Sequence, residues 1–190
     1  MNKFGIILGE PNSINSEILA KSNVYKKKAV IIGSLDLLKS QFKTLKINRK
    51  LKKIQSLEDI EKPGKYLYVL DVPLKFKEPF SVNSKDSSVY VKKCLITGHK
   101  LCLKNKIKGI INCSINKKTV FKNKNLGVTE FLAKKNKIHN SEVMIIYNKR
   151  LSVAPLTTHI KLNSVSRNIK KNLLIKKIKT LNKCYLRYFK

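Results

Sequence analysis

The sequence has no tryptophan, few glycines and no long apolar run. A membrane-spanning helix needs roughly 20 consecutive apolar residues, and no segment approaches that length. The first residues hold too short an apolar stretch for a secretory signal peptide, and no small-residue cleavage site follows it. With 42% apolar residues, the composition is that of a globular protein. We therefore expect a cytoplasmic protein that makes no membrane contact.

Cysteine is also scarce, and its spacing excludes the common cysteine motifs. The sequence has four cysteines, with no CxxC pair and no zinc-like spacing. Their neighbours are apolar or basic, which favours buried or half-buried free thiols over a redox or catalytic role. These residues are Cys94, Cys102, Cys113 and Cys184.

Acidic residues are few: 11 of them face 42 lysines and arginines, for a formal net charge of +31. Such a charge suggests a nucleic-acid partner. However, only four of the basic residues are arginine, the usual choice for bidentate phosphate and base contacts. The lysines are also spread along the whole chain rather than gathered into one arm. A basic nucleic-acid- or ribosome-associated α/β protein therefore stays an alternative hypothesis, with nucleic acid the less favoured partner.

What the sequence does contain is a series of short apolar runs separated by helical patterns. Four runs predict buried strands, at 4–8, 29–33, 66–70 and 109–113. Apolar residues at helical spacing predict helices at 35–45, with Ser34 as its cap, and at 84–103. Strands that alternate with helices predict an α/β fold, with a mostly parallel sheet and helices on both faces.

The last third of the chain predicts a strand pair and a helix. Segments 142–147 and 151–156 are apolar enough to be strands, joined by a turn at 148–150. A lysine-rich helix follows, whose apolar residues step by four and three: Leu174, Ile178, Leu181, Tyr185 and Tyr188. Such a face normally packs against something, and no further segment follows to cover it. We therefore expect this stripe to be exposed.

Three polar segments are candidate sites, and each also has a purely structural explanation. The loop at 9–16 leads from a strand into a helix capped by Asn15 or Ser16, but a plain strand-to-helix turn would look the same. It is not a GxGxxG dinucleotide fingerprint. In the segment 127–133, Thr129 is suited to cap a helix or to bind an oxygen-rich ligand. The segment 151–162 ends a predicted strand on two threonines and His159, although a lone histidine is more often a structural or surface residue.

In order and spacing, these segments resemble the PdxA family of 4-hydroxythreonine-4-phosphate dehydrogenases. Residues 9–18 fit the family's GDPAGIGPE-like loop, and residues 112–117 fit a TGPINK-like strand end. The two more specific matches are GVTEF at 127–131, against GHTEF, and LSVAPLTTHIKL at 151–162, against a strand of the form LRVALxTTHxPL. The resemblance covers essentially the whole chain but only about the first half to three-fifths of the family's length.

The resemblance implies a two-domain α/β subunit related to isocitrate and isopropylmalate dehydrogenases, and a homodimer. It places residues 1–110 in a first lobe and 111–190 at the start of a second. It implies NAD-dependent oxidation of 4-phosphooxy-L-threonine, followed by decarboxylation, in pyridoxal 5′-phosphate synthesis. A divalent metal (zinc, magnesium or cobalt) held by three histidines would assist, with His159 as the first ligand and Thr129 in contact with the substrate.

Departures from the family pattern predict that this chain is inactive alone. Val128 stands where the family has a substrate-binding histidine. Cys113 and Ser114 replace a Gly-Pro or Ala-Pro pair, which we expect to relax the loop before Lys117. The residues that would supply two more metal histidines and the nicotinamide site do not occur in the chain. A non-catalytic PdxA-like subunit is therefore a further alternative.

Overall fold

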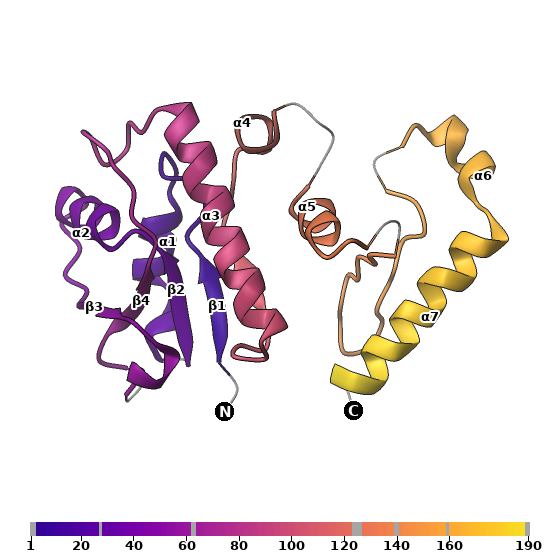
Figure 1. The fold of residues 1–190 in the computed structure, drawn as a ribbon, viewed down its shortest axis with the longest axis horizontal. Coiled ribbons are helices and arrows are strands. Elements are labelled where there is room, and N and C mark those ends of the chain that lie inside the picture. Colours follow the sequence, from indigo (N-terminus) through magenta and orange to yellow (C-terminus); the bar gives the residue numbers. More distant parts are fainter. Residues whose placement is uncertain are drawn as a thin grey trace. The chain divides into compact units, whose positions relative to one another are not determined.

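The computed structural model describes residues 3–26, 28–61, 64–122, 127–138, 141–158 and 160–188. The chain forms two compact units, Met1–Leu126 and Gly127–Lys190 (Figure 1), which we describe separately. The division into lobes near residue 110, which the family resemblance implied, stays a prediction.

The first unit is built on a five-stranded sheet in which every pairing is parallel. The strands are β1 (Phe4–Ile7), β2 (Ala29–Gly33), β3 (Leu51–Ile54), β4 (Leu67–Asp71) and β5 (Ile110–Asn112), in the order β3-β4-β2-β1-β5. The central strand β2 is buried along its whole length, as expected for a parallel strand covered on both faces. Four of the five strands coincide with the predicted apolar runs. The edge strand β3 was not predicted.

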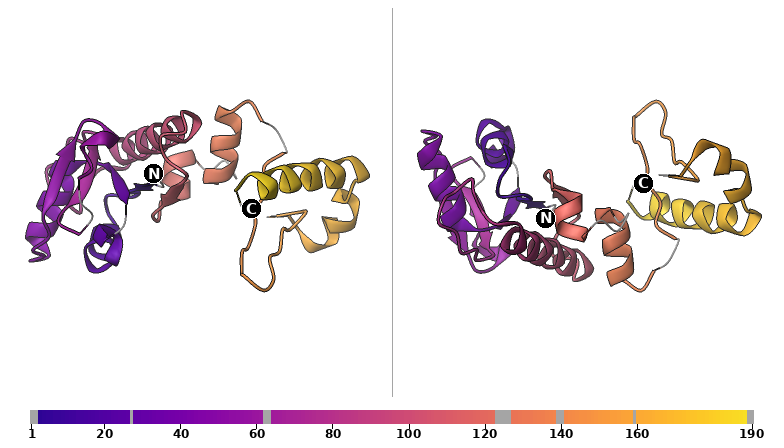
Figure 2. Two further views of the ribbon diagram at one scale, coloured as in Figure 1. Left: turned by 90° about the horizontal axis from the view of Figure 1, so that it is seen from below. Right: turned by 90° about the horizontal axis from the view of Figure 1, so that it is seen from above.

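Helices cover both faces of this sheet, which confirms the predicted fold class. The helices α1 (Asn15–Lys21) and α2 (Leu35–Thr44) lie on one face, and α3 (Ser84–Leu103) lies on the other (Figure 2). The long helix approaches closely at Gly98, where an added Cβ would come within 2.7 Å of the Ile7 side chain. A short helix, α4 (Lys117–Phe121), follows β5, and two 3-10 turns lie at Asn23–Lys26 and Leu57–Asp59.

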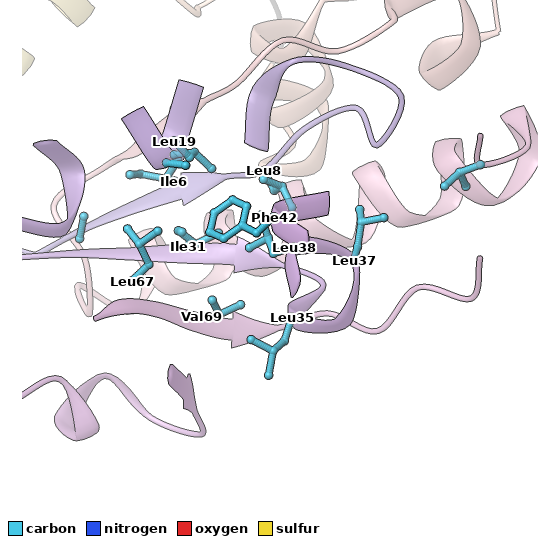
Figure 3. Packing of buried hydrophobic residues seen from close by; sticks show 13 residues of the cluster. Ile6, Leu8, Leu19, Ile31, Leu35, Leu37, Leu38, Phe42, Leu67 and Val69 are labelled. Carbon is cyan, nitrogen blue, oxygen red and sulfur yellow. The ribbon is translucent and has the colours of Figure 1, made fainter. Parts of the chain in front are cut away.

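The main hydrophobic core lies between the sheet and the pair α1 and α2 (Figure 3). Strand residues such as Ile6, Ile31 and Val69 pack there against Leu38 and Phe42 of α2. A second cluster on the opposite face joins Val30 and Tyr68 to the end of α3. These two layers fix the carboxyl ends of the strands, where open α/β sheets bind ligands.

The second unit contains more helix and little sheet. Its helices are α5 (Val128–Lys135), α6 (Val165–Asn168) and α7 (Lys171–Tyr188), with a 3-10 turn at Leu162–Ser164. The strands predicted at 142–147 and 151–156 were wrong: these segments meet in a single antiparallel bridge between Ile146 and Val153. Both bridge residues are exposed, so burial does not extend the pairing.

The predicted apolar stripe of the last helix is at least partly exposed. Leu174 is 42% exposed and Ile178 is 55% exposed, while Leu181 and Tyr185 are half-buried. The side chain of Tyr188 lies outside the described residues. No helix in the described part of the chain has the length and apolar character needed to cross a membrane.

Candidate functional site

Two loops meet at the carboxyl edge of the sheet in the first unit. The loop after β1 begins at Gly9, whose φ of +78° lies in the left-handed region that glycine adopts without strain. The next residue, Glu10, donates its backbone N–H to the Ser114 carbonyl at 3.0 Å. Ser114 belongs to the loop after β5. The two motif segments 9–16 and 112–117, which are far apart in sequence, therefore lie side by side.

Asn15 joins these loops through its side chain rather than capping a helix. Its amide donates to the Leu8 carbonyl at 3.0 Å and to the Ser114 carbonyl at 2.9 Å. Its oxygen accepts from the Ser114 hydroxyl at 2.7 Å. The predicted cap at Asn15 or Ser16 was wrong: both residues are inside α1, and Ile14 precedes it. The loop before Lys117 is thus held, not relaxed as we expected.

The carboxylate of Glu10 lies beneath the same loop. One oxygen accepts a hydrogen bond from the Ser87 hydroxyl of α3 at 2.6 Å, while the other is buried and has no partner among the residues that the structure describes. The loop is also fastened to the segment before α3, because the Asn12 amide both donates to and accepts from the backbone of Val82, at 2.7 and 2.8 Å. Side-chain hydrogen bonds therefore fasten the loop after β1 to α3 and to the segment before it.

The ends of β2 and β4 are fixed by a second set of bonds. Ser34 caps α2, as predicted, by accepting from the Leu37 N–H at 3.2 Å. The Ser34 N–H donates to the buried Tyr90 hydroxyl at 2.9 Å, and burial holds the pKa of that phenol well above its usual value. Asp71, at the end of β4, accepts from the Leu35 N–H at 3.0 Å. Asp71 directly follows the strand predicted at 66–70, whereas no pattern in the sequence indicates the role of Tyr90.

Two surface cavities open beside this edge. One, of about 310 Å³, lies between the segment after β4 and the first half of α3, and is lined by Pro73, Leu74, Lys75, Asp86, Val89, Tyr90 and Lys93. The other, of about 460 Å³, shares Lys75 and Asp86 with it. Neither cavity was predicted from the sequence, because cavities between a loop and a helix leave no periodic pattern.

The cysteines of the first unit have the character of inert thiols. Burial raises the pKa of Cys94 to about 12, and burial also raises the pKa of Cys102 and Cys113. A thiol with a raised pKa carries little thiolate at neutral pH, and the thiolate is the reactive form. All four cysteines are free, as predicted.

In the second unit, Thr129 lies exposed in the first turn of α5. It does not cap the helix, although its position in the sequence suited it to that role. The helix begins after Gly127, whose N–H donates to the Glu130 carboxylate at 2.8 Å. The hydroxyl of Thr129 is therefore not needed for capping. Its role as a substrate contact stays a prediction.

The segment that contains the TTH motif is described up to Thr158. Thr157 is half-buried and Thr158 is exposed. The Leu156 carbonyl accepts from the Lys177 ammonium of α7 at 2.9 Å. His159 lies outside the described residues, so its role as a metal ligand stays a prediction. In the described residues, no three His, Cys, Asp or Glu side chains gather as a metal site.

Comparison with known proteins agrees with the motif assignment. The family "Pyridoxal phosphate biosynthetic protein PdxA" matches residues 25–190. The 4-hydroxythreonine-4-phosphate dehydrogenase of Aquifex aeolicus (strain VF5) is 34% identical over 198 residues, which cover 99% of this chain and 59% of the relative. The enzyme of the same name from Sulfurihydrogenibium sp. (strain YO3AOP1) is 33% identical, over 96% of this chain and 58% of the relative.

Solved structures share the fold. The crystal structure of 4-hydroxythreonine-4-phosphate dehydrogenase from Klebsiella pneumoniae matches with a TM-score of 0.84 and 21% identity, over 98% of this chain and 58% of that one. A protein described as a putative enzyme of the same name, from Salmonella typhimurium, matches with a TM-score of 0.82 and 23% identity, over 94% of this chain and 58% of that one. The chain thus shares the α/β fold of these structures, and it spans under three-fifths of the length of these proteins. Because the family match extends over most of its residues, the chain belongs to the PdxA family.

Proposed function

We propose that this chain supplies part of an NAD-dependent 4-hydroxythreonine-4-phosphate dehydrogenase of pyridoxal phosphate biosynthesis, and that it is inactive alone. The observation that carries this proposal is the match to relatives of that name along 99% of the chain, at 34% identity. The substrate would be 4-phosphooxy-L-threonine, oxidised at its secondary hydroxyl and then decarboxylated. The meeting of the two motif loops at one sheet edge supports a site there.

Two residues of the second unit would take part. The exposed hydroxyl of Thr129 can donate a hydrogen bond to a substrate oxygen. A neutral His159 imidazole would be one ligand of a divalent zinc, magnesium or cobalt ion. Such an ion lowers the pKa of a bound hydroxyl and polarises the developing ketone.

The described residues alone do not make up that metal site, since they contain no group of three His, Cys, Asp or Glu that could hold an ion. A structural or catalytic zinc site has three or more protein ligands. We therefore assign no step to a metal or to NAD within this chain, and propose that further residues complete both sites, in a cytoplasmic homodimer. Val128 can neither bind a metal nor donate a hydrogen bond, so this position weakens substrate contact.

A chimera tests the proposal. Residues 1–190 would replace the matching portion of the Aquifex aeolicus enzyme, and NADH formation from 4-phosphooxy-L-threonine would be followed with added divalent metal. We expect turnover by the chimera, faster turnover with Val128→His, and none with His159→Ala. The 190-residue chain by itself should form no NADH, because losing a few kcal/mol of transition-state stabilisation slows a reaction by orders of magnitude.

Two outcomes would contradict the proposal. Robust metal-dependent turnover by the 190-residue chain would show that it needs no further residues. A folded chimera that stays inactive even with Val128→His would show that the chain no longer serves this reaction. The matched control is Leu103→Gln, since Leu103 is an exposed side chain at the end of α3, outside both motif loops, and its replacement should leave turnover unchanged.

A further inference from the structure

The contact between Asn15 and Ser114 uses nearly every polar group that either side chain has. Both N–H groups of the Asn15 amide donate, one to Leu8 and one to Ser114, and its oxygen accepts from the Ser114 hydroxyl. The Ser114 carbonyl accepts twice, from Asn15 and from the Glu10 N–H. A carbonyl oxygen has two lone pairs, so this one is saturated.

The contact between Asn15 and Ser114 also leaves little free space around the Asn15 side chain. Asn15 is only 3% exposed. A Cβ added at Gly9 would come within 2.5 Å of the Ser114 carbonyl oxygen and 2.8 Å of the Asn15 amide nitrogen. The glycine therefore lets the two loops approach, and the amide fills the room that remains.

Asn15 and Ser114 each differ from the family motif, and the two differing positions contact each other. In the GDPAGIGPE-like loop the position of Asn15 is a glycine, and in the TGPINK-like strand end the position of Ser114 is a proline. A glycine could not make the amide bonds, and a proline has no hydroxyl to donate. Each new polar group finds its partner in the other, 99 residues away. The two replacements thus compensate each other.

We propose that Asn15 and Ser114 are a coupled pair of positioning residues that fixes the segment 113–117 against the end of β1. The pair takes over the stiffness that a proline would give this loop. Through this loop the pair sets the position of Lys117, the first residue of α4, at the carboxyl edge of the sheet. Only the importance of Lys117 rests on the proposed function; the coupling itself does not.

Thiol labelling in the folded protein tests the coupling, because Cys113 adjoins Ser114 and is half-buried. The probe is a small aromatic disulfide, with each labelled cysteine identified by mass spectrometry. Asn15→Ala removes the amide bonds to the Leu8 and Ser114 carbonyls and the acceptor of the Ser114 hydroxyl, so we expect Cys113 to react about tenfold faster or more. Cys102, at the end of α3, is the internal control and should change less than twofold.

A double-variant cycle separates coupling from general damage. Asn15→Gly and Ser114→Pro should each speed Cys113 labelling, while the double variant, which restores the family pair, should label more slowly than Asn15→Gly. Asn15→Asp keeps an acceptor but loses both donors, so it should not restore the wild-type rate. If Asn15→Ala fails to fold, Ser114→Ala removes a single bond, and hydrogen exchange of the 113–117 amides gives the same comparison.

Three results would overturn the inference. Asn15→Ala could leave the Cys113 rate unchanged. It could speed Cys113 and Cys102 equally, which is global destabilisation. The fold-changes of Asn15→Gly and Ser114→Pro could multiply independently in the double variant. A failed dehydrogenase assay with a positive labelling cycle would reject the proposed function and leave the coupling intact.

Discussion

The two units of this chain differ in how much of their apolar surface they bury. Among the described residues, every buried apolar side chain except Ala133 belongs to the first unit. Of the 18 large apolar side chains that are exposed, 13 belong to the second unit, including four on α7: Leu174, Ile175, Ile178 and Leu186. The first unit has the core of an independent domain, whereas the described residues of the second unit do not form one.

The difference shows where the stability of this chain resides. Burial of apolar surface is the dominant favourable term in folding, and ordering each residue costs conformational entropy. The first unit has a core on both faces of its sheet. The second unit, with one buried apolar side chain among the residues described, has little to offset that cost. We infer that the first unit unfolds last.

The largest expected effect comes from matched leucine substitutions in the two units. Leu38 is fully buried in the main core, whereas Leu174 is 42% exposed on α7. Leu38→Ala should lower the free energy of unfolding by about 2–5 kcal/mol, through lost burial and the cavity left behind. Leu174→Ala should change it by no more than about 0.5 kcal/mol. Urea unfolding followed by circular dichroism measures both, and similar losses would erase the contrast between the units.

The buried thiol of the first unit predicts a loss of stability at alkaline pH. The pKa of Cys94 is about 12 in the folded chain, above the ordinary value of 9.0. The unfolded thiol therefore ionises first, so the stability is complete below pH 9 and falls as pH rises toward 12. The loss should reach about 1.4 kcal/mol per pH unit.

Unfolding measured from pH 8 to 11 tests this, with Cys94→Ala as the control. The variant should lose stability less steeply, although Tyr90, whose pKa is also raised, contributes in both proteins. Identical pH dependence in the two proteins would show that the Cys94 thiol is accessible to solvent.

The smallest expected effect comes from substitutions at two helix starts, one in each unit. Ser34 caps α2 in the first unit, and Glu130 closes the first turn of α5 in the second. Ser34→Ala should lower the free energy of unfolding by about 1 kcal/mol. Glu130→Ala should reduce helix content locally and leave the main unfolding midpoint in place. A shift of that midpoint by Glu130→Ala as large as that by Ser34→Ala would mean that the two units unfold together.

The sequence predicted the fold well where burial produces a continuous apolar run. Strands β1, β2, β4 and β5 were predicted for that reason. The edge strand β3 was missed because Lys52 and Lys53 interrupt its apolar pattern, and an edge strand needs no second buried face. The strand pair predicted around residue 150 has apolar residues but no core to bury them, so only one bridge forms.

The roles predicted for Thr129 and His159 stay predictions, and the bonds that join the two motif loops were not predicted. Both motif loops follow strands that were predicted, and the structure shows that they meet at the carboxyl edge of the sheet, where open α/β sheets bind ligands. The contact of Asn15 with Ser114 joins residues 99 positions apart, and neither side chain carries a signal for it. The same bonds explain why the predicted helix cap at Asn15 was wrong. An asparagine near the start of a helix usually bonds to a nearby backbone group, whereas the Asn15 side chain bonds to Leu8 and Ser114.

Native-state hydrogen exchange is the most direct test of the contrast between the units. Amides of β1, β2 and β4 should exchange only when the whole first unit unfolds, whereas amides of α7 should exchange through local opening. We therefore predict protection of the central strands that exceeds that of α7 by a factor of about 100 or more, the equivalent of roughly 2.7 kcal/mol. Equal protection in the sheet and in α7 would contradict the claim that the second unit has no core of its own.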